Sequence, residues 1–537
     1  MSELNSLSVA PAGGKPLRLR THGLVVFCLL FLLTLFVRFA FFFSATIDWD
    51  EVTFVLIGQS LADGHLPYEQ AWDVKPPLGF AFYAAVIQLL GHSVAAIRLG
   101  GTLCVAATAF FVYAIACRIW GRAAARLAAS LTILGMSLLE SGQATMTEHV
   151  MLVPFMAAVV VAVRSGPPTR TWFAVGALLS AATLVRFNAA FAVLPVAVFA
   201  YFDLRRSPSR GKAIAAYCCG ATLPVAFIAA VYVAAGEFGD LWTTVVTAPL
   251  SYGESRGSAI RTLAWQVRNA FGLSPQAITV PWLTGYLWCL ATLGFGTAWL
   301  RWRQAHEEQR RGLALVTLLT LAAAAGVLLS GQPLEHYLIQ LVPFAALLSA
   351  ALIHQADRRT RAVIWAGAGL CAALSFAPIV AEYRGLLSRV GDGGRAAYGR
   401  SYEVADYLSA QNPARRPVFL LNDHLAYWLL RQPPPTRWAA HPSTFSNSWR
   451  LLEAFGTTAE AELRAVFRLH PEFVTIPQHI WFMDCHLERV LRDSLADGYV
   501  PDVRIGRSII YRRSSLGVPG PVNRRHDLEA WTTACDG

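Results

Sequence analysis

Apolar runs of about 20 residues, each long enough to cross roughly 30 Å of hydrocarbon as a helix, recur from Gly23 to about Ala381. Over the whole chain, 55% of the residues are hydrophobic and 15% are charged, whereas about 25% of the residues of an ordinary soluble protein are charged. The sequence therefore predicts a polytopic α-helical membrane protein.

Basic residues predict the orientation, because short cytoplasmic loops collect Lys and Arg. Lys15, Arg18 and Arg20 precede the first apolar run. This run is too long for the apolar core of a signal peptide, and no small-residue cleavage site follows it. We expect a retained first span, with residues 1–22 as a cytoplasmic N-terminus.

Arginine-rich turns alternate with polar turns, which predicts about eleven spans within residues 23–381. An odd number of spans places residues 382–537 on the same outer side as a first loop, 44–92, and a second loop, 236–277. In residues 382–537 charged and polar residues replace the apolar runs, and we predict a small outer α/β domain there. Its β-prone runs are Pro417–Leu421 and Arg507–Tyr511.

The net charge of +11 is explained by arginines at the ends of spans, so we predict no nucleic-acid partner. Of the nine cysteines, all but Cys485 and Cys535 lie in apolar segments, where thiols behave as small hydrophobes. A disulfide between those two remains an open alternative.

Ionisable residues gather at the predicted outer ends of the spans. The first outer loop holds Asp48, Asp50, Glu51 and Lys75, and ionisable groups at a membrane boundary are functional candidates. We predict a site on the outer face that includes these four residues. The other candidates are Glu148, His149, Arg186, Arg256, Arg261, His336 and Tyr337.

Structural roles compete with functional ones for the residues of the first loop. Asp50 and Glu51 are well placed to stabilise the N-terminus of a following helix. Lys75 precedes two prolines and has the features of a lysine that extends its charge to the membrane surface. Both interpretations stay open for these three residues.

The later candidates have alternatives too. Arg186 interrupts an apolar hairpin, where a charge needs a partner, and this favours a function. Glu148 and His149 are adjacent, and neighbours on a helix diverge in direction, which disfavours a shared metal ion. His336 and Tyr337 stand at a span start, where aromatic residues often anchor a helix at the interface.

Several motifs resemble a known family. Trp49–Glu51 reads W-D-E, Asp73–Leu78 reads D-V-K-P-P-L, and Arg118–Arg122 reads R-I-W-G-R. Together with M-T-E-H-V-M-L-V-P from Met146 and H-Y-L-I-Q-L-V-P from His336, they resemble GT-C glycosyltransferases of the protein-mannosyltransferase type. Within this type, the motifs most resemble those of the lipid A aminoarabinose transferases and the rhizobial galacturonosyltransferases. The resemblance covers about Thr34 to Ala350 and implies a GT-C fold.

The resemblance also implies the chemistry. Members take a sugar from a polyprenyl monophosphate and pass it, with inversion, to an acceptor hydroxyl. The family's first-loop aspartate corresponds to Asp50, the general base, beside Glu51 in the catalytic pair. Lys75 and Arg186 would bind the donor phosphate.

Some relatives have an arginine where Thr53 stands here, and Arg256 or Arg261 is the expected replacement. The remaining candidates would orient the acceptor or hold a divalent cation, whose presence the sequence leaves open. They are Asp48, Glu148, His149, His336 and Tyr337.

The sequence thus predicts a glycosyltransferase of a bacterial inner membrane, with its site facing the periplasm or the cell exterior. Its expected partners are a polyprenyl-phosphate-linked sugar, membrane lipids, and an envelope glycolipid or polysaccharide as acceptor. A protein O-mannosyltransferase-like enzyme and a lipid-linked glycan flippase are the alternatives. A transporter would place polar groups near the membrane midplane, which makes the flippase the weaker hypothesis. A ligase that uses a diphosphate-linked polymer would need a large arginine-rich outer loop, and it ranks below the transferase.

Overall fold

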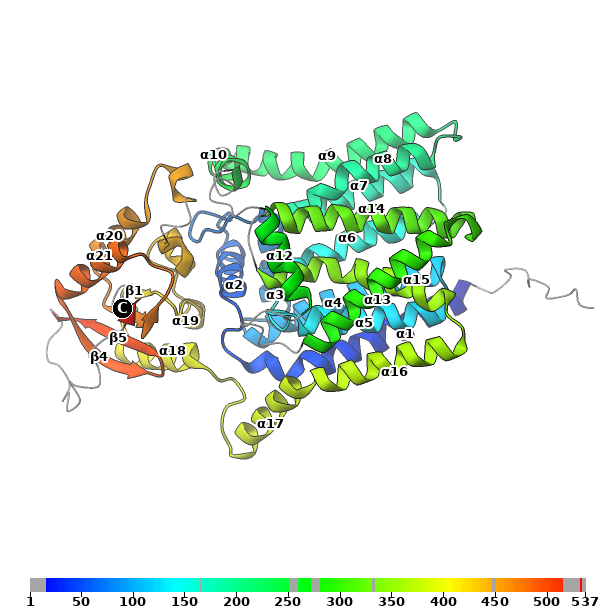
Figure 1. Cartoon of the computed structure of the whole chain (residues 1–537). Helices are drawn as coiled ribbons and strands as arrows, with labels where there is room; N and C mark the ends of the chain where they lie inside the picture. The colour runs from blue at the N-terminus through cyan, green and yellow to red at the C-terminus, as the bar shows by residue number, and fades with distance from the viewer. Residues whose placement is uncertain are drawn as a thin grey trace, which may run out of the picture.

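The computed structural model of the protein describes residues 16–164, 166–250, 259–271, 281–330, 334–446, 451–514 and 532–533. Long helices form a bundle, and a smaller mixed α/β region lies at one end of it (Figure 1). The helices of the bundle are α1 (Pro16–Arg38), α4 (Val94–Ile119), α5 (Arg122–Leu138), α6 (Thr147–Val163), α7 (Pro168–Val185), α8 (Val193–Asp203), α9 (Arg210–Ala235), α13 (Pro281–Leu300), α14 (Glu307–Leu329), α15 (Val342–Gln355) and α16 (Arg358–Ser375).

Within the described residues, five helical segments are long and apolar enough to cross a membrane, which agrees with a multi-pass membrane protein. The number is six if α16 and α17 (Ala377–Gly391), bent by 44° at their junction, form one span. The prediction of about eleven spans is therefore not confirmed. Several of the predicted spans correspond to apolar helices of 10–17 residues, such as Thr147–Val163 and Phe187–Asp203, which are short for a membrane crossing.

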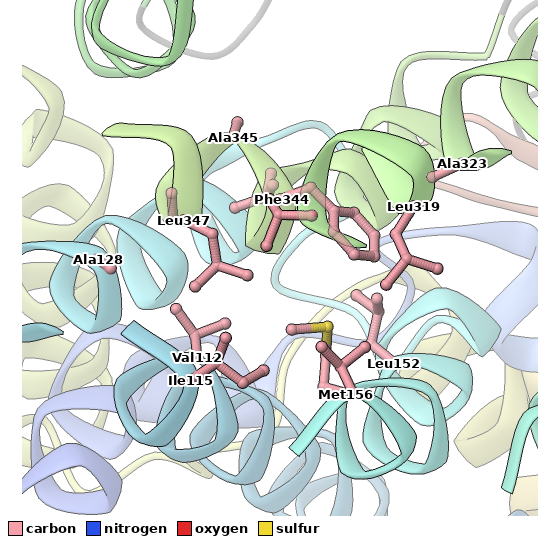
Figure 2. Packing of buried hydrophobic residues seen from close by; sticks show 14 of the residues in the cluster. Val112, Ile115, Ala128, Leu152, Met156, Leu319, Ala323, Phe344, Ala345 and Leu347 are labelled. Atoms are coloured by element: carbon pink, nitrogen blue, oxygen red, sulfur yellow. The ribbon is translucent and has the colours of Figure 1, made fainter. Parts of the chain in front are cut away.

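The bundle has its own hydrophobic core. Side chains from α4, α5, α6, α14 and α15 meet in its interior, as Figure 2 shows for Val112, Leu152, Met156, Leu319 and Phe344. All five side chains are buried. The bundle therefore provides a packed frame for the polar loops at its end.

The first loop of the sequence prediction, residues 44–92, contains two helices, α2 (Trp49–Ala62) and α3 (Pro77–Leu90). Helix α2 lies between the bundle and the α/β region (Figure 1). The two helices pack closely at Gly58, where an added Cβ would stand only 2.5 Å from the Cβ of Tyr83.

The C-terminal region combines helices with a four-stranded sheet of order β1-β2-β5-β4. Strand β1 pairs in parallel with β2, and the other two pairs are antiparallel. Both β-prone runs of the sequence form strands, as predicted. The elements are α18 (Arg400–Gln411), β1 (Val418–Leu420), α19 (Leu425–Leu429), α20 (Ala459–Arg468), β2 (Phe473–Pro477), β3 (His479–Ile480), α21 (Cys485–Ala496), β4 (Tyr499–Ile505), β5 (Ser508–Arg513) and β6 (Thr532–Thr533), with β3 paired to β6.

Shorter elements connect these parts. They are η1 (Phe39–Phe43), η2 (Phe187–Ala192), α10 (Phe238–Trp242), η3 (Thr243–Thr247), α12 (Ala259–Ala270), η4 (Trp302–Gln304), η5 (Glu335–Leu341), η6 (Arg437–Ala440), η7 (Pro442–Phe445) and η8 (Leu452–Phe455). The domain boundary predicted at residue 382 falls inside α17, which runs across it. Cys485 is in a disulfide, while Cys535 lies outside the described residues.

The first loop and the C-terminal region share a second hydrophobic core. Buried residues such as Phe54 and Tyr83 belong to the same cluster as Phe419, Trp428 and Leu487. Hydrogen bonds add to this contact: the Trp428 indole donates to Gln59 at 3.2 Å, and the Thr53 hydroxyl donates to the Ala440 carbonyl at 3.1 Å. The C-terminal region therefore holds the loop that contains the first set of candidate residues.

Candidate functional site

The start of α2 positions the first two candidate carboxylates. Asp48 is the N-cap, and its Oδ1 accepts a hydrogen bond of 2.8 Å from the Asp50 amide, as an aspartate in this position commonly does. Asp50 and Glu51 then occupy the first helical turn, where the helix dipole favours negative charge. The predicted capping role therefore belongs mainly to Asp48.

Lys75 lies against Asp50. Its Nζ stands 3.1 Å from Asp50 Oδ2 and 3.2 Å from Asp73 Oδ1. Pro76 and Pro77 begin α3 directly after it, which fixes the backbone that carries this lysine. The side chains of Asp50 and Lys75 are 17% and 15% exposed, so the pair is largely desolvated but reachable.

A histidine from the C-terminal region contacts the other oxygen of Asp50. His441 Nε2 lies 3.1 Å from Asp50 Oδ1, while the Ser443 amide donates to His441 Nδ1 at 3.1 Å. Because Nδ1 accepts this hydrogen bond, the ring hydrogen resides on Nε2 and is donated to Asp50. Sequence reasoning missed His441, since 391 positions separate it from Asp50 and no motif surrounds it.

These contacts set the charge state of Asp50. Burial by itself would raise the pKa of this carboxyl, but Lys75 and the hydrogen bond from His441 hold its pKa well below the usual range. In the same way, burial opposes the charge on Lys75, but Asp50 and Asp73 raise the pKa of that amine. The pair is therefore ionised in this state of the protein.

Glu51 has a different environment from its neighbour. Its Oε2 accepts a hydrogen bond of 3.0 Å from Arg98 Nη2, and its Oε1 accepts one of 2.6 Å from the Thr145 amide. Arg98 also donates to the carbonyls of Ser44 and Ala45, at 2.6 and 3.3 Å. Glu51 thus forms a buried ion pair with α4 and accepts a hydrogen bond from the loop before α6.

Asp48 faces His336, one of the two histidines that the sequence predicted for the site. Its Oδ2 accepts a hydrogen bond from the Ser141 hydroxyl and lies 4.0 Å from His336 Nδ1. Burial and the nearby charge of Asp50 raise the pKa of Asp48. The other ring nitrogen of His336 lies 3.8 Å from Glu148 Oε1, so this histidine stands between the two acidic centres.

Glu148 pairs with Arg186. Arg186 Nη2 lies 3.0 Å from Glu148 Oε1, and Nη1 donates to the Thr147 hydroxyl at 2.8 Å. The guanidinium also lies over the Tyr337 ring, 4.5 Å from its centroid. The sequence predicted that Arg186, which interrupts an apolar hairpin, would need a partner for its charge. Glu148 is that partner.

The remaining predicted residues are His149, Arg261 and Arg256. His149 is buried and accepts a hydrogen bond of 3.2 Å from the Met146 amide, so its ring caps α6. Arg261 lies on α12, and Arg256 lies outside the described residues. Among the residues that the structure describes, no group of three or more His, Cys, Asp or Glu is arranged to hold a metal ion.

An aromatic group adjoins Asp50. The Trp49 ring stacks on Trp481 with centroids 5.6 Å apart and planes inclined by 17°, and Phe482 meets Trp49 edge-on at 5.6 Å. His424 donates to the Trp49 carbonyl at 3.1 Å, and burial and the neighbouring His441 lower the pKa of this histidine to about 3. Sequence reasoning missed Trp481, Phe482 and His424 too, because no local motif marks them.

Comparison with known proteins adds to this geometry. Residues 74–233 match the family described as "Dolichyl-phosphate-mannose-protein mannosyltransferase". The matched segment includes Lys75, Glu148 and Arg186. No curated protein matches the chain in sequence.

Two crystal structures of ArnT from Cupriavidus metallidurans share the fold. The apo structure has a TM-score of 0.60 and 15% identity, and the alignment covers 94% of this chain and 100% of that one. The structure bound to undecaprenyl phosphate has a TM-score of 0.61, with the same identity and coverage. Together with the family match, this similarity identifies a GT-C fold, as the sequence motifs predicted.

Proposed function

From the GT-C glycosyltransferase fold and the segment that matches the protein mannosyltransferases, we propose that this protein is an inverting, polyprenyl-phosphate-dependent glycosyltransferase. The observation that carries the proposal is the contact of 3.1 Å between Asp50 and Lys75. It joins a partly exposed carboxylate to a cation of the kind that binds a phosphate. ArnT, which has the same fold, has been crystallised with undecaprenyl phosphate, and this supports a lipid-phosphate donor.

The reaction is a single displacement. The acceptor hydroxyl oxygen attacks the anomeric carbon from the face opposite the phosphate, and its proton passes to Asp50. The bond between the anomeric carbon and the phosphate oxygen breaks, and the polyprenyl phosphate leaves with the electron pair. A positioned general base contributes about 10²- to 10⁴-fold to the rate, and a carboxylate suffices because the phosphate is a good leaving group.

Lys75 and Arg186 hold the leaving phosphate in this proposal. Preorganised cations stabilise charge that develops in the transition state, and both residues have carboxylate partners that position them. Glu148 orients Arg186, while Asp73 remains beside Lys75 when the phosphate draws Nζ away from Asp50. Glu51 orients the first turn of α2 through Arg98 and does not touch substrate.

The remaining acidic and aromatic candidates serve the acceptor. Asp48, His336 and Tyr337 lie between Asp50 and the Arg186 pair, and they border the path of the attacking hydroxyl. A divalent cation is not needed in this scheme, since Lys75 and Arg186 already neutralise the carboxylates Asp50 and Glu148.

We place the site on the outer face of a bacterial inner membrane, with an envelope glycolipid or polysaccharide as the acceptor. Arginine-rich turns at the opposite ends of the spans favour this orientation. The disulfide at Cys485 supports it as well, because disulfides persist in oxidising compartments.

The test uses the full-length protein in detergent, a panel of radiolabelled polyprenyl-phosphate sugars and an envelope lipid extract. The wild type should transfer label from one donor to a glycolipid. Asp50→Asn should lose about 10²- to 10⁴-fold of this rate while it still binds the donor. Equal rates in both proteins would remove Asp50 from the mechanism, and no transfer from any donor would favour the flippase.

A further inference from the structure

Trp481 presents an unusual surface beside the candidate base. It directly follows β3 and is 66% exposed, although its ring is stacked on Trp49 at 5.6 Å. Phe482, which is 9% exposed, meets both tryptophan rings edge-on, at 5.6 and 5.8 Å. The Trp481 ring is therefore held from one face and from its edge, and much of its surface stays open to solvent.

This ring belongs to the environment of Asp50. Trp49 is the residue before Asp50, and the His441 ring, which donates to Asp50, lies edge-on to Trp49 at 6.2 Å. A single exposed aromatic residue on a protein surface needs no explanation. A stack of two tryptophans that includes the residue before a partly exposed carboxylate does need one.

A sugar ring has the matching chemistry. One face of a pyranose carries mainly C–H groups, which pack against an aromatic face, while its hydroxyls point outward to polar partners. A sugar stacked on Trp481 would contact an aromatic stack that ends at Trp49, the residue before Asp50. A serine or threonine side chain of a peptide has no comparable apolar face.

We propose that Trp481, supported by Trp49 and Phe482, forms an acceptor subsite that binds the ring of a carbohydrate. This inference rests on the proposed function and narrows it, because it assigns the acceptor hydroxyl to a sugar and not to a polypeptide. Trp481 contacts the acceptor, whereas Trp49 and Phe482 position Trp481. The subsite also gives the C-terminal region a direct part in acceptor recognition.

The experiment separates acceptor binding from the chemistry. Full-length wild type, Trp481→Ala and Trp481→Phe would be assayed with the donor selected above, against the envelope glycolipid extract, its de-lipidated oligosaccharide fraction and a peptide containing Ser and Thr. Slow transfer to water, measured in parallel, reports on the base and the donor site. The matched control is Trp242→Ala, which removes another tryptophan, 53% exposed, on α10.

For Trp481→Ala we expect a KM for the oligosaccharide about tenfold higher, the effect of one lost stacking contact, with transfer to water within about twofold of wild type. Trp481→Phe should recover most of the affinity, and Trp242→Ala should match the wild type. Equal losses in Trp481→Ala and Trp242→Ala would indicate membrane anchoring and overturn the subsite. So would transfer to the peptide alone. No transfer or hydrolysis by the wild type from any donor would reject the proposed function itself.

Discussion

Asp50 and Glu51 are adjacent on the first turn of α2, yet their surroundings differ in every respect that decides function. The Asp50 side chain is 17% exposed and shares Lys75 with Asp73. The Glu51 side chain is 4% exposed, and its partner Arg98 is fully buried. One carboxylate has a partly exposed cation that it shares with a second carboxylate, and the other has a cation enclosed by protein.

The difference follows from helix geometry. Successive residues on a helix point about 100° apart, so one side chain faces the C-terminal region while the next faces α4 and the loop before α6. Glu51 is saturated by Arg98 and by the Thr145 amide, which suits a role in architecture. Asp50 is the one whose contacts are suited to change during a reaction.

The largest effect on stability should come from Glu51. Glu51→Ala leaves Arg98 buried without its carboxylate, and breaking a buried ion pair costs about 3 to 5 kcal/mol. We expect a fall of the apparent Tm by many degrees, measured by thermal unfolding in detergent, whereas Asp50→Asn should change the Tm little.

A double variant tests whether the loss of stability in Glu51→Ala comes from the unpaired charge of Arg98. Glu51→Met combined with Arg98→Met replaces both charges by apolar side chains, which often restores stability at such sites. We expect partial recovery, since the carbonyls of Ser44 and Ala45 lose their donor. No recovery at all would contradict the view that an unpaired charge causes the loss.

Removal of Lys75 should have the next largest effect, on the donor side. For Lys75→Met we expect kcat/KM for the donor to fall about 10²-fold, the usual cost of one group that stabilises transition-state charge. The control is Lys212→Met, because Lys212 is an exposed lysine in the first turn of α9. A similar loss in both variants would indicate a general effect of charge on the lipid surface.

The same variant should change the pH dependence. In the wild type Lys75 helps to keep the pKa of Asp50 well below the usual range against the effect of burial. The base is ionised above its pKa and is lost as the pH falls through it, so removing Lys75 should move the acidic limb of kcat/KM to higher pH. An acidic limb at the same pH in both proteins would show that Lys75 does not lower the pKa of the group that limits activity.

The membrane bundle and most residues of the site could be predicted from the sequence, but the different surroundings of Asp50 and Glu51 could not. Apolar runs and arginine-rich turns predicted a membrane bundle, and the candidates Asp48, Asp50, Lys75, Glu148, Arg186 and His336 do meet in space. The pattern D-E could not show that its two carboxylates face different partners. That distinction depends on which residues of α4 and of the C-terminal region each side chain meets.

Long-range partners explain the other gaps. His441 and Trp481 approach α2 only because the first loop and the C-terminal region share one hydrophobic core, and no local pattern marks either residue. The number of spans was not confirmed, because some apolar segments form helices of only 10–17 residues.

The apolar residues of these short helices contribute to the core of the bundle, as Leu152 and Met156 of α6 do.

His441 should have a smaller effect than Lys75, because it contributes a single hydrogen bond to Asp50, whereas Lys75 contributes an ion pair. A hydrogen bond to a charged group contributes about 1.5 to 3 kcal/mol, and His441→Leu should lower kcat about tenfold or somewhat more with an unchanged donor KM. It should also raise the pH of the acidic limb.

Rescue distinguishes positioning from general packing at this residue. His441→Gln keeps an N–H donor of similar reach and should regain much of the lost kcat, whereas His441→Leu should not. If both substitutions gave the same rate and the same pH profile, the hydrogen bond to Asp50 would have no part in catalysis.

The smallest effect should come from the opposite end of the bundle, where Arg118 and Glu308 form an ion pair of 2.7 Å with side chains 40% and 69% exposed. Exposed pairs contribute about 0 to 1 kcal/mol, so Glu308→Ala should change neither the apparent Tm nor the rate of transfer beyond error. The distance in this pair is shorter than that between Glu51 and Arg98, so distance alone would predict the opposite order. If Glu308→Ala destabilised the protein as much as Glu51→Ala, burial would not be what separates architectural charges from the others.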